Sequence, residues 1–482
     1  MQHPHTIRRL TLAVIPFVLA GLAAGLHAVA PPPQDGGQRI TAPEGPTVTW
    51  EEIDKLVSEQ KLEAAAAAVA ELRESARASG DNAAWTRALV TEVQLRMGLH
   101  GYETAVRFLR EAEWPSDAVS RAVLDLYYAQ SLVSYAGIYS WEIRDRERVA
   151  SDDEVDLKRW TLEQIVAEAN RAYGRVWHER GRWGEASIGE LARYIEQNDY
   201  PARIRGTLRD AVSYLWVELL ADSSLWRPGQ ANQLYQLDAP ALIAGDPAHS
   251  GELDLADPRV HPLSKIGAVL DDLESWHHSA GRPEAALEAR LERLRRLHAA
   301  FSSSHDKRAV REHLQSVQSE FDRSFEWWSM GQAALAEMLQ GEDEGDSLVR
   351  ARQEAQAGAE RHPSSVGGAR CRHLVAAIEA PAFTLEAMAL DAANRRSIRV
   401  THRNLDALHF RAYAFDLEDA VTGAKDYNLL PGYREVPGWI DSRKPAAAWT
   451  EELPATPDYR DHASDATPPM TAPGAYLVVV SA

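Results

Sequence analysis

The sequence is poor in cysteine and lysine, and its charge is unbalanced. Among 482 residues there is one cysteine, Cys371, which excludes an internal disulfide, a cysteine-rich zinc module and an iron–sulfur cluster. Seven of the 52 basic residues are lysine, and 71 acidic residues give a net charge of −19. This charge repels phosphate backbones and anionic lipid head groups, and no basic run exceeds two residues. The composition therefore argues against nucleic-acid binding.

Common nucleotide-binding and catalytic motifs are also missing. The sequence contains no G-x-x-x-x-G-K-[ST] and no G-x-G-x-x-G, the glycine-rich loops that hold nucleotide phosphates. It also lacks G-x-S-x-G and H-E-x-x-H. We therefore predict that the chain is not an enzyme, with no catalytic, cofactor-binding or metal-binding residues and no cofactor.

Residues 1–30 have the pattern of a secretory signal. Arg8 and Arg9 precede an uncharged apolar stretch, which closes on the small residues Ala28-Val29-Ala30. Pro31 follows, and a proline directly after the cleavage site makes a poor substrate for signal peptidase. The signal is therefore cleaved after Ala28 instead, or it is not cleaved. An uncut stretch of about 20 apolar residues would just span a bilayer. We predict a periplasmic or secreted protein, anchored in the inner membrane if the signal is retained.

After a Pro/Gly-rich linker at residues 31–48, the segment 49–362 shows helical periodicity. A first helix is predicted from Thr49, which forms a capping box with Glu52, to the stop signal Gly80-Asp81. The next two helices, 85–97 and 102–112, are joined by a glycine-containing turn that is typical of a tetratricopeptide-like hairpin. Further helices are predicted at 118–149, 161–176, 187–197 with a Ser187–Glu190 capping box, 204–221, 266–279, 281–297, 307–339 and 348–361. No strict 34-residue period recurs, so we expect an irregular helical array, which typically offers a broad surface to a protein partner.

The segment 363–482 has β-strand patterns. Short runs rich in β-formers occur at 383–388, 398–403, 408–415, 448–453 and 476–480, separated by loops with Asn, Asp, Pro or Gly. In the third run Leu408, Phe410, Ala412 and Ala414 alternate with other residues, as in a half-buried strand. The predicted fold class is α + β multidomain: a mainly α-helical, tetratricopeptide-like array followed by an antiparallel β-sandwich.

Several segments of this end resemble bacterial alpha-2-macroglobulin-type proteins. The resemblance is most specific over 354–482, and the residues that carry it are Ala359 to Cys371, Ile378 to Glu386, Val400 to Tyr413, Leu453 to His462 and Pro473 to Ala482. Its most informative motif is Arg403-Asn404-Leu405, where Asn404 is expected to turn the chain at a strand end. The resemblance implies a macroglobulin-type β-sandwich in a secreted or periplasmic protease trap.

Members of that family are long chains with a bait segment and often a Cys-x-Glu-Gln thioester. Here Cys371 is followed by Arg372-His373-Leu374, so it forms no thioester, and no bait segment is assigned. The resemblance therefore implies the non-enzymatic N-terminal portion of an endopeptidase inhibitor, as a fragment or as the product of a split gene. Its partners would be a protease or the remaining macroglobulin domains. The alternative is a periplasmic helical-repeat scaffold for a protein partner, and the third is a cell-envelope hydrolase.

The remaining chemical candidates have structural alternatives that we favour. Ser304 and Lys307 match S-x-x-K but lack its companion motifs. The histidines 277, 278, 298, 305 and 313 are predicted to be solvated, because their spacing does not place three on one helical face. The acidic run 341–346 is predicted to be a solvated loop between helices, and Cys371 a semi-buried structural thiol. Most of the 14 tryptophans, among them Trp141 and Trp216, are predicted to lie in helix cores.

Overall fold

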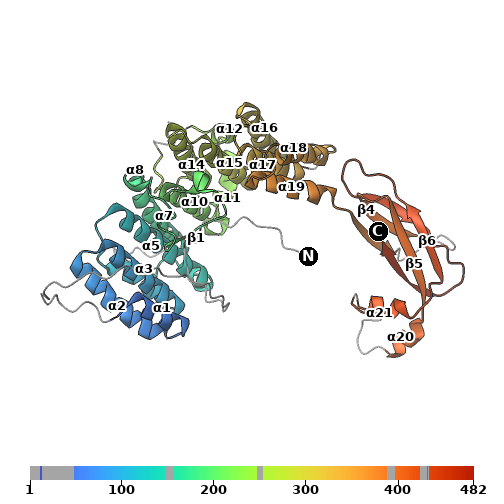
Figure 1. Cartoon of the computed structure of the whole chain (residues 1–482), viewed down its shortest axis with the longest axis horizontal. Coiled ribbons are helices and arrows are strands. Elements are labelled where there is room, and N and C mark those ends of the chain that lie inside the picture. Colours follow the sequence, from blue (N-terminus) through green and yellow to red (C-terminus); the bar gives the residue numbers. More distant parts are fainter. Residues whose placement is uncertain are drawn as a thin grey trace, which may run out of the picture. The chain divides into compact units, whose positions relative to one another are not determined.

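The structure is a computed structural model of the chain, shown in Figure 1. It describes residues 11–12, 48–147, 156–246, 253–342, 344–387, 397–423, 431–432 and 434–482. The predicted signal or anchor at 1–30, apart from 11–12, and the linker up to residue 47 lie outside the described residues. Within the described ranges, no helix is both long and apolar enough to cross a bilayer.

The chain divides into two compact units, Met1–His313 and Leu314–Ala482. The division falls inside helix α16 (Ser304–Glu320), within the segment predicted as one helical array. Unit 1 is almost entirely helical, whereas unit 2 combines helices with two small antiparallel sheets. The predicted α + β class, mainly helical, is therefore confirmed.

Unit 1 begins with four helices in succession, in blue in Figure 1: α1 (Trp50–Ser58), α2 (Leu62–Ser79), α3 (Asn82–Gly98) and α4 (Tyr102–Glu111). The Thr49 hydroxyl caps α1 by accepting a hydrogen bond from the Glu52 amide. The single helix predicted from Thr49 to Gly80 is broken at Gln60, whose φ of 59° turns the chain. Gly80 ends α2 with a φ of 72°, as its stop signal predicted.

The middle of unit 1 is built on two long helices, α5 (Ala118–Ile138) and α7 (Leu162–His178), which pack against each other. The helix α10 (Leu208–Ala221) is buried along most of its length, and its buried residues include the polar Arg209, Asp210 and Ser213. Short elements join them: α6 (Ser140–Ile143), α8 (Arg180–Trp183), β2 (Ile195–Glu196), which pairs with β1 (Thr11–Leu12), and α9 (Ala202–Arg205).

Near its end, unit 1 contains a helical hairpin of α14 (Pro262–Ser279) and α15 (Pro283–Ala300), which precedes α16. The turn contains Gly281 with a φ of 68°, a conformation that favours glycine. Among the described residues before the hairpin are the short helices η1 (Ser223–Leu225), α11 (Gln230–Gln233), η2 (Leu234–Gln236) and α12 (Ala239–Ala244).

The helix predicted at 187–197 is wrong. These residues form turns and the strand β2, and the Ser187 hydroxyl accepts a hydrogen bond from the Gly189 amide instead of capping a helix. The Ile188 amide donates to the Gly206 carbonyl, a contact between distant parts of the chain. Tertiary hydrogen bonds thus replace the local helical ones.

Unit 2 contains three closely packed helices after α16: α17 (Trp328–Gln340), α18 (Ser347–Arg361) and α19 (Val366–Glu379). The helix predicted at 307–339 is divided by the turn at Asp322, whose carboxylate accepts from the Ser324 amide. Because α19 lies beyond residue 362, helices continue past the expected start of the β-rich segment.

The strands of unit 2 form two three-stranded antiparallel sheets, with orders β3-β4-β7 and β6-β5-β8. Their bounds are β3 (Ala382–Ala387), β4 (Ile398–Arg403), β5 (Ala407–Phe415), β6 (Ala447–Glu452), β7 (His462–Ala466) and β8 (Ala475–Ser481), and the short helices α20 (Leu417–Gly423) and α21 (Val436–Asp441) lie between β5 and β6. Val400 and Ala466 of one sheet and Leu408 and Phe410 of the other belong to one apolar cluster. The five predicted strands are present, and β7 is additional.

The strand β5 follows the predicted alternation over most of its length. Leu408, Phe410 and Ala412 are buried, but the pattern then shifts so that Tyr413 is buried and Ala414 is exposed. The ring of Tyr413 contacts Trp439 of α21 edge-on, with ring centroids 6.0 Å apart. The helix α21 therefore covers the opposite face of this strand at its end.

Candidate functional site

The residues singled out as possible catalytic groups do not converge. Ser304 is exposed at the start of α16, and Lys307 lies one turn further along the same helix. The acidic run 341–346, apart from residue 343, which lies outside the described residues, falls between α17 and α18. Among the described residues, no three His, Cys, Asp or Glu side chains are grouped to hold a metal ion.

The prediction that the histidines are solvated is wrong for His277. Its side chain is 1% exposed, and its Nε2 lies 2.7 Å from Oδ1 of Asp210, which is equally buried. Asp210 also closes a capping box with Thr207 at the start of α10, so the pair links α10 to α14. His278 and His305 are exposed, and His298 and His313 are half-buried.

Cys371 is more deeply buried than predicted. Its thiol is inaccessible and lies 3.3 Å from the Ser329 carbonyl oxygen, to which it donates a hydrogen bond. Burial, and to a smaller extent the charge of Glu337, raises the pKa of this thiol to about 12. A thiol in this state is a packing group between α17, α18 and α19.

The described part of unit 1 contains a groove of about 1350 Å³, referred to below as the α5–α7 groove. Its walls come mainly from α4, α5 and α7, with Trp85 of α3, Trp183 of α8 and Trp216 of α10. Its charged lining consists of Arg110, Glu113, Arg121, Asp125, Arg171, Arg175, His178, Glu179 and Asp254. Sequence patterns did not identify this groove, because its lining comes from segments that are far apart in the chain.

Four exposed arginines stand along the groove on three helices: Arg110 on α4, Arg121 on α5, and Arg171 and Arg175 on α7. Two buried carboxylates hold three of them. Arg175 Nη2 lies 2.6 Å from Asp125 Oδ1, Arg171 Nη2 lies 2.7 Å from Glu168 Oε2, and Arg110 Nη1 lies 3.5 Å from Glu168 Oε1.

The carboxylates beneath the arginines are held out of water. Burial raises the pKa of Asp125, and the neighbouring Arg175 offsets part of that rise. Glu168 is also buried, with 6% of its side chain exposed, whereas the side chains of Arg110, Arg171 and Arg175 are 46–51% exposed. The carboxylates therefore fix the arginines in place while much of each guanidinium still faces solvent.

Aromatic side chains form the rest of the groove wall. Trp216 is fully buried, stacks on Tyr173 with ring centroids 5.9 Å apart, and donates from Nε1 to Asn170 Oδ1 at 2.9 Å. Trp177 meets Trp216 edge-on at 6.1 Å and carries the Arg180 guanidinium 3.5 Å above its ring. The expectation of core tryptophans holds for Trp216, whereas Trp141 is 71% exposed.

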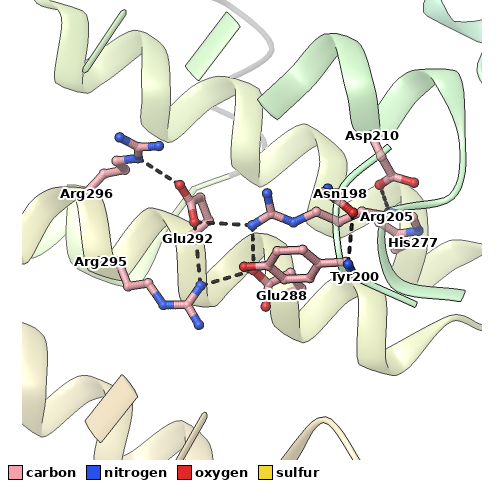
Figure 2. A network of polar contacts seen from close by, with 9 residues as sticks. All are labelled: Asn198, Tyr200, Arg205, Asp210, His277, Glu288, Glu292, Arg295 and Arg296. Atoms are coloured by element: carbon pink, nitrogen blue, oxygen red, sulfur yellow. Dashed lines mark hydrogen bonds and ion pairs between the residues drawn. The ribbon is translucent and has the colours of Figure 1, made fainter. Parts of the chain in front are cut away.

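A buried ion network connects α9 to α15 elsewhere in unit 1 (Figure 2). Arg205 Nη2 lies 2.7 Å from Glu288 Oε1 and 3.3 Å from Glu292 Oε2, and its guanidinium carbon is 3.6 Å from the centre of the Tyr214 ring. Burial alone would raise the pKa of Glu292, but Arg205, Arg296 and Arg295 outweigh it and lower the pKa to about 2. Figure 2 shows Glu292 between three arginines. The network therefore holds α9 against α15 through paired charges.

A smaller cavity of about 50 Å³ lies between α7, α10 and the start of α14. Most of its lining side chains are apolar, and the polar ones are Glu163, Asn170, Arg227, Gln230 and Lys265. Lys265 is 3% exposed, and burial lowers its pKa to about 8 although Asp257 and Asp254 act in the opposite direction.

The exposed arginines and tryptophans of these sites are suited to binding a ligand. Exposed guanidinium groups bind carboxylates in a bidentate manner, and indole faces accept apolar groups. Comparison with known proteins adds no relative: no protein-family model, no curated protein and no solved structure matches the chain.

Proposed function

We propose that the chain is the non-enzymatic N-terminal portion of an exported alpha-2-macroglobulin-like protease inhibitor. The observation that carries this proposal is the arrangement of β3 to β8, two three-stranded antiparallel sheets whose side chains share one apolar cluster. Two sheets that share an apolar cluster support a β-sandwich, in which two sheets pack face to face. It falls on residues 382–481, within the segment that resembles the family.

The position of Asn404 supports the same proposal. It follows β4 with a φ of 52°, and its side-chain Nδ2 donates to the carbonyl oxygens of Ile378 at 2.8 Å and Ala380 at 3.2 Å. The most informative motif of the resemblance thus lies where α19 ends and β4 meets β5.

The coding sequence next to this chain tests the proposal. We expect further sandwich domains, in frame or in an adjacent gene, together with a bait segment or Cys-x-Glu-Gln. A neighbourhood without any of these would contradict it.

An experiment with the purified protein tests whether the chain alone binds a protease covalently or inhibits it. Because Cys371 is buried and followed by Arg372, the chain incubated with a serine protease should form no adduct that survives denaturing electrophoresis, and casein hydrolysis should continue unchanged. A stable adduct, or a stoichiometric loss of caseinolytic activity, would refute the proposal that this chain lacks the bait segment and the thioester that trap a protease.

A second function, a helical scaffold for a protein partner outside the cell, is favoured by the α5–α7 groove. A volume of about 1350 Å³ exceeds the roughly 300–1,000 Å³ typical of small-molecule sites. A pull-down with the chain that recovers one stoichiometric partner without protease activity would favour the scaffold. Recovery of macroglobulin domains alone would favour the inhibitor.

A further inference from the structure

We propose that the α5–α7 groove binds an extended, acidic segment of a partner protein, with acidic side chains on the arginines and apolar side chains between the indoles. This inference rests on the scaffold function above and names the chemistry of its ligand. Its basis is the juxtaposition of four exposed arginines with half-buried tryptophans in one hollow.

The arginine wall has an excess of positive charge. Four guanidinium groups, those of Arg110, Arg121, Arg171 and Arg175, are associated with only two carboxylates, Asp125 and Glu168. Within the described part of the chain, Arg121 is exposed and makes no ion pair. In a protein with a net charge of −19, such a wall is a local exception that attracts acidic groups.

Besides Asp125, three acidic residues line the groove: Asp254 is exposed, and the other two already have basic partners of their own. Glu113 lies 2.7 Å from Arg77 Nη2, and Glu179 lies 3.2 Å from Arg182 Nη1. They therefore offset little of the charge on the arginine wall. Arg175 and Arg171 use their Nε and Nη2 groups on the buried carboxylates, so a ligand carboxylate would bind their remaining donors and the guanidinium of Arg121.

The aromatic part of the groove selects against a purely charged ligand. Trp85, Trp114 and Trp177 are half-buried and line the same hollow as the arginines. Their flat faces accept apolar side chains or peptide groups without requiring a particular hydrogen bond. An extended segment places successive side chains on opposite sides, so alternating acidic and apolar residues match two walls of different chemistry.

A nucleic acid would also offer anionic groups and flat bases to such a groove. The observations favour a polypeptide, because the negative charge of the whole chain opposes the approach of a long polyanion, whereas a short acidic segment carries few charges. A short oligonucleotide therefore serves as a competitor in the test.

The test uses the whole chain and a fluorescein-labelled 12-residue peptide that alternates Glu with Leu, and fluorescence anisotropy measures its binding. We expect saturable binding that weakens at least tenfold when Gln replaces every Glu, and that weakens further as salt is raised. A peptide with Lys in place of Glu should not bind. Equal binding of the Glu and Gln peptides, or no binding of the Glu peptide, overturns the proposal.

Arg121→Gln locates the site, because Arg121 is exposed and its loss removes no ion pair from the described part of the fold. We expect at least fivefold weaker binding of the Glu peptide. Arg144→Gln is the matched control, since Arg144 is equally exposed, makes no ion pair with a described residue and does not line the groove. Unchanged affinity in Arg121→Gln, or the same loss in both variants, overturns the assignment, as does a 12-nucleotide single strand that displaces the peptide with higher affinity.

The failure of this inference differs from a failure of the scaffold function. If a stoichiometric partner is recovered by pull-down and Arg121→Gln retains it fully, the scaffold function stands and the groove assignment fails. If no partner is recovered while the Glu peptide binds as expected, the groove chemistry stands and the scaffold function loses its support.

Discussion

Lys265 and Glu292 are both buried, but their surroundings stabilise the charged form of Glu292 and destabilise the charged form of Lys265. Three arginines surround Glu292 and lower its pKa to about 2, so its charged form is favoured despite burial. For Lys265, burial outweighs the charges of Asp257 and Asp254 and lowers the pKa to about 8. Glu292 is a paired charge in the ion network between α9 and α15, whereas the charge of Lys265 destabilises the fold.

Replacing Lys265 by Met should therefore stabilise the protein. The folded-state pKa of about 8 lies below the ordinary value of 10.5, so the folded protein binds fewer protons than the unfolded chain between these two values. The destabilisation is complete below about pH 8 and disappears as pH rises to about 10.5. At pH 7 we expect Lys265→Met to raise the free energy of unfolding by about 1–3 kcal/mol, as measured by urea denaturation.

The difference between Lys265→Met and the unchanged chain should shrink toward pH 10. Lys158→Met is the control, because the Lys158 side chain is 75% exposed. A gain that is independent of pH, or equal in both variants, would show that the buried ammonium group is not its cause.

Asn404 combines a special backbone conformation with two side-chain hydrogen bonds, and two substitutions separate these contributions. Asn404→Ala loses both bonds and keeps a side chain at a φ of 52°, so we expect a loss of about 2–3 kcal/mol. Asn404→Gly loses the bonds alone and should cost about 1 kcal/mol less than alanine. Urea denaturation measures both, and equal losses would rule out a backbone contribution.

Sequence patterns predicted single residues well where the cause is local. An asparagine between two strands indicates a turn, and Asn404 makes one. The buried pair of His277 and Asp210 had no such indication, because its members lie on different helices and each looks like an ordinary polar position in its own segment. The arginine wall was missed for the same reason.

Helices and strands were predictable where periodicity and end signals agree. The strand β4 has its predicted bounds, and the capping position Thr161 begins α7. Residues 187–197 failed because hydrogen bonds to distant residues replaced the helical pattern, and β7 was missed because His462-Ala-Ser-Asp-Ala466 has few β-formers. Its pairing with β4 defines it as a strand.

The packing of α17 against α19 depends on Gly367. A β-carbon at this position would collide with the backbone of Ser329 and Met330, which a side-chain rotation cannot relieve. We expect Gly367→Ala to destabilise the protein by about 1–3 kcal/mol, although alanine is the better helix former. The shift in thermal midpoint measures the effect.

Gly137→Ala provides the matched control for Gly367→Ala. Gly137 lies within α5, and a β-carbon there meets no atom within 4 Å. This substitution should leave stability unchanged or raise it by up to about 1 kcal/mol. A loss in Gly137→Ala equal to that in Gly367→Ala would contradict the steric explanation.

For the whole molecule, the division into two compact units predicts that unfolding is not a single transition. Lys265 belongs to unit 1 and Gly367 to unit 2. In differential scanning calorimetry we expect two transitions, with Lys265→Met shifting one upward and Gly367→Ala shifting the other downward. A single transition that moves with both substitutions would show that the units unfold together.

The general division into a helical part and a β-rich part was predictable from the change in periodicity. The limits of the compact units were not, because the boundary falls inside α16, where the sequence gives no break in its helical pattern. The limits of a compact unit depend on which helices contact each other, and the residue pattern of a single helix does not predict those contacts.

The ion network between α9 and α15 has a consequence for heat. The hydration of charged groups becomes less favourable as temperature rises, so keeping Arg205, Glu288 and Glu292 away from water costs less in a warm cell than in a cold one. This ion network should therefore become more favourable on warming and less favourable in the cold.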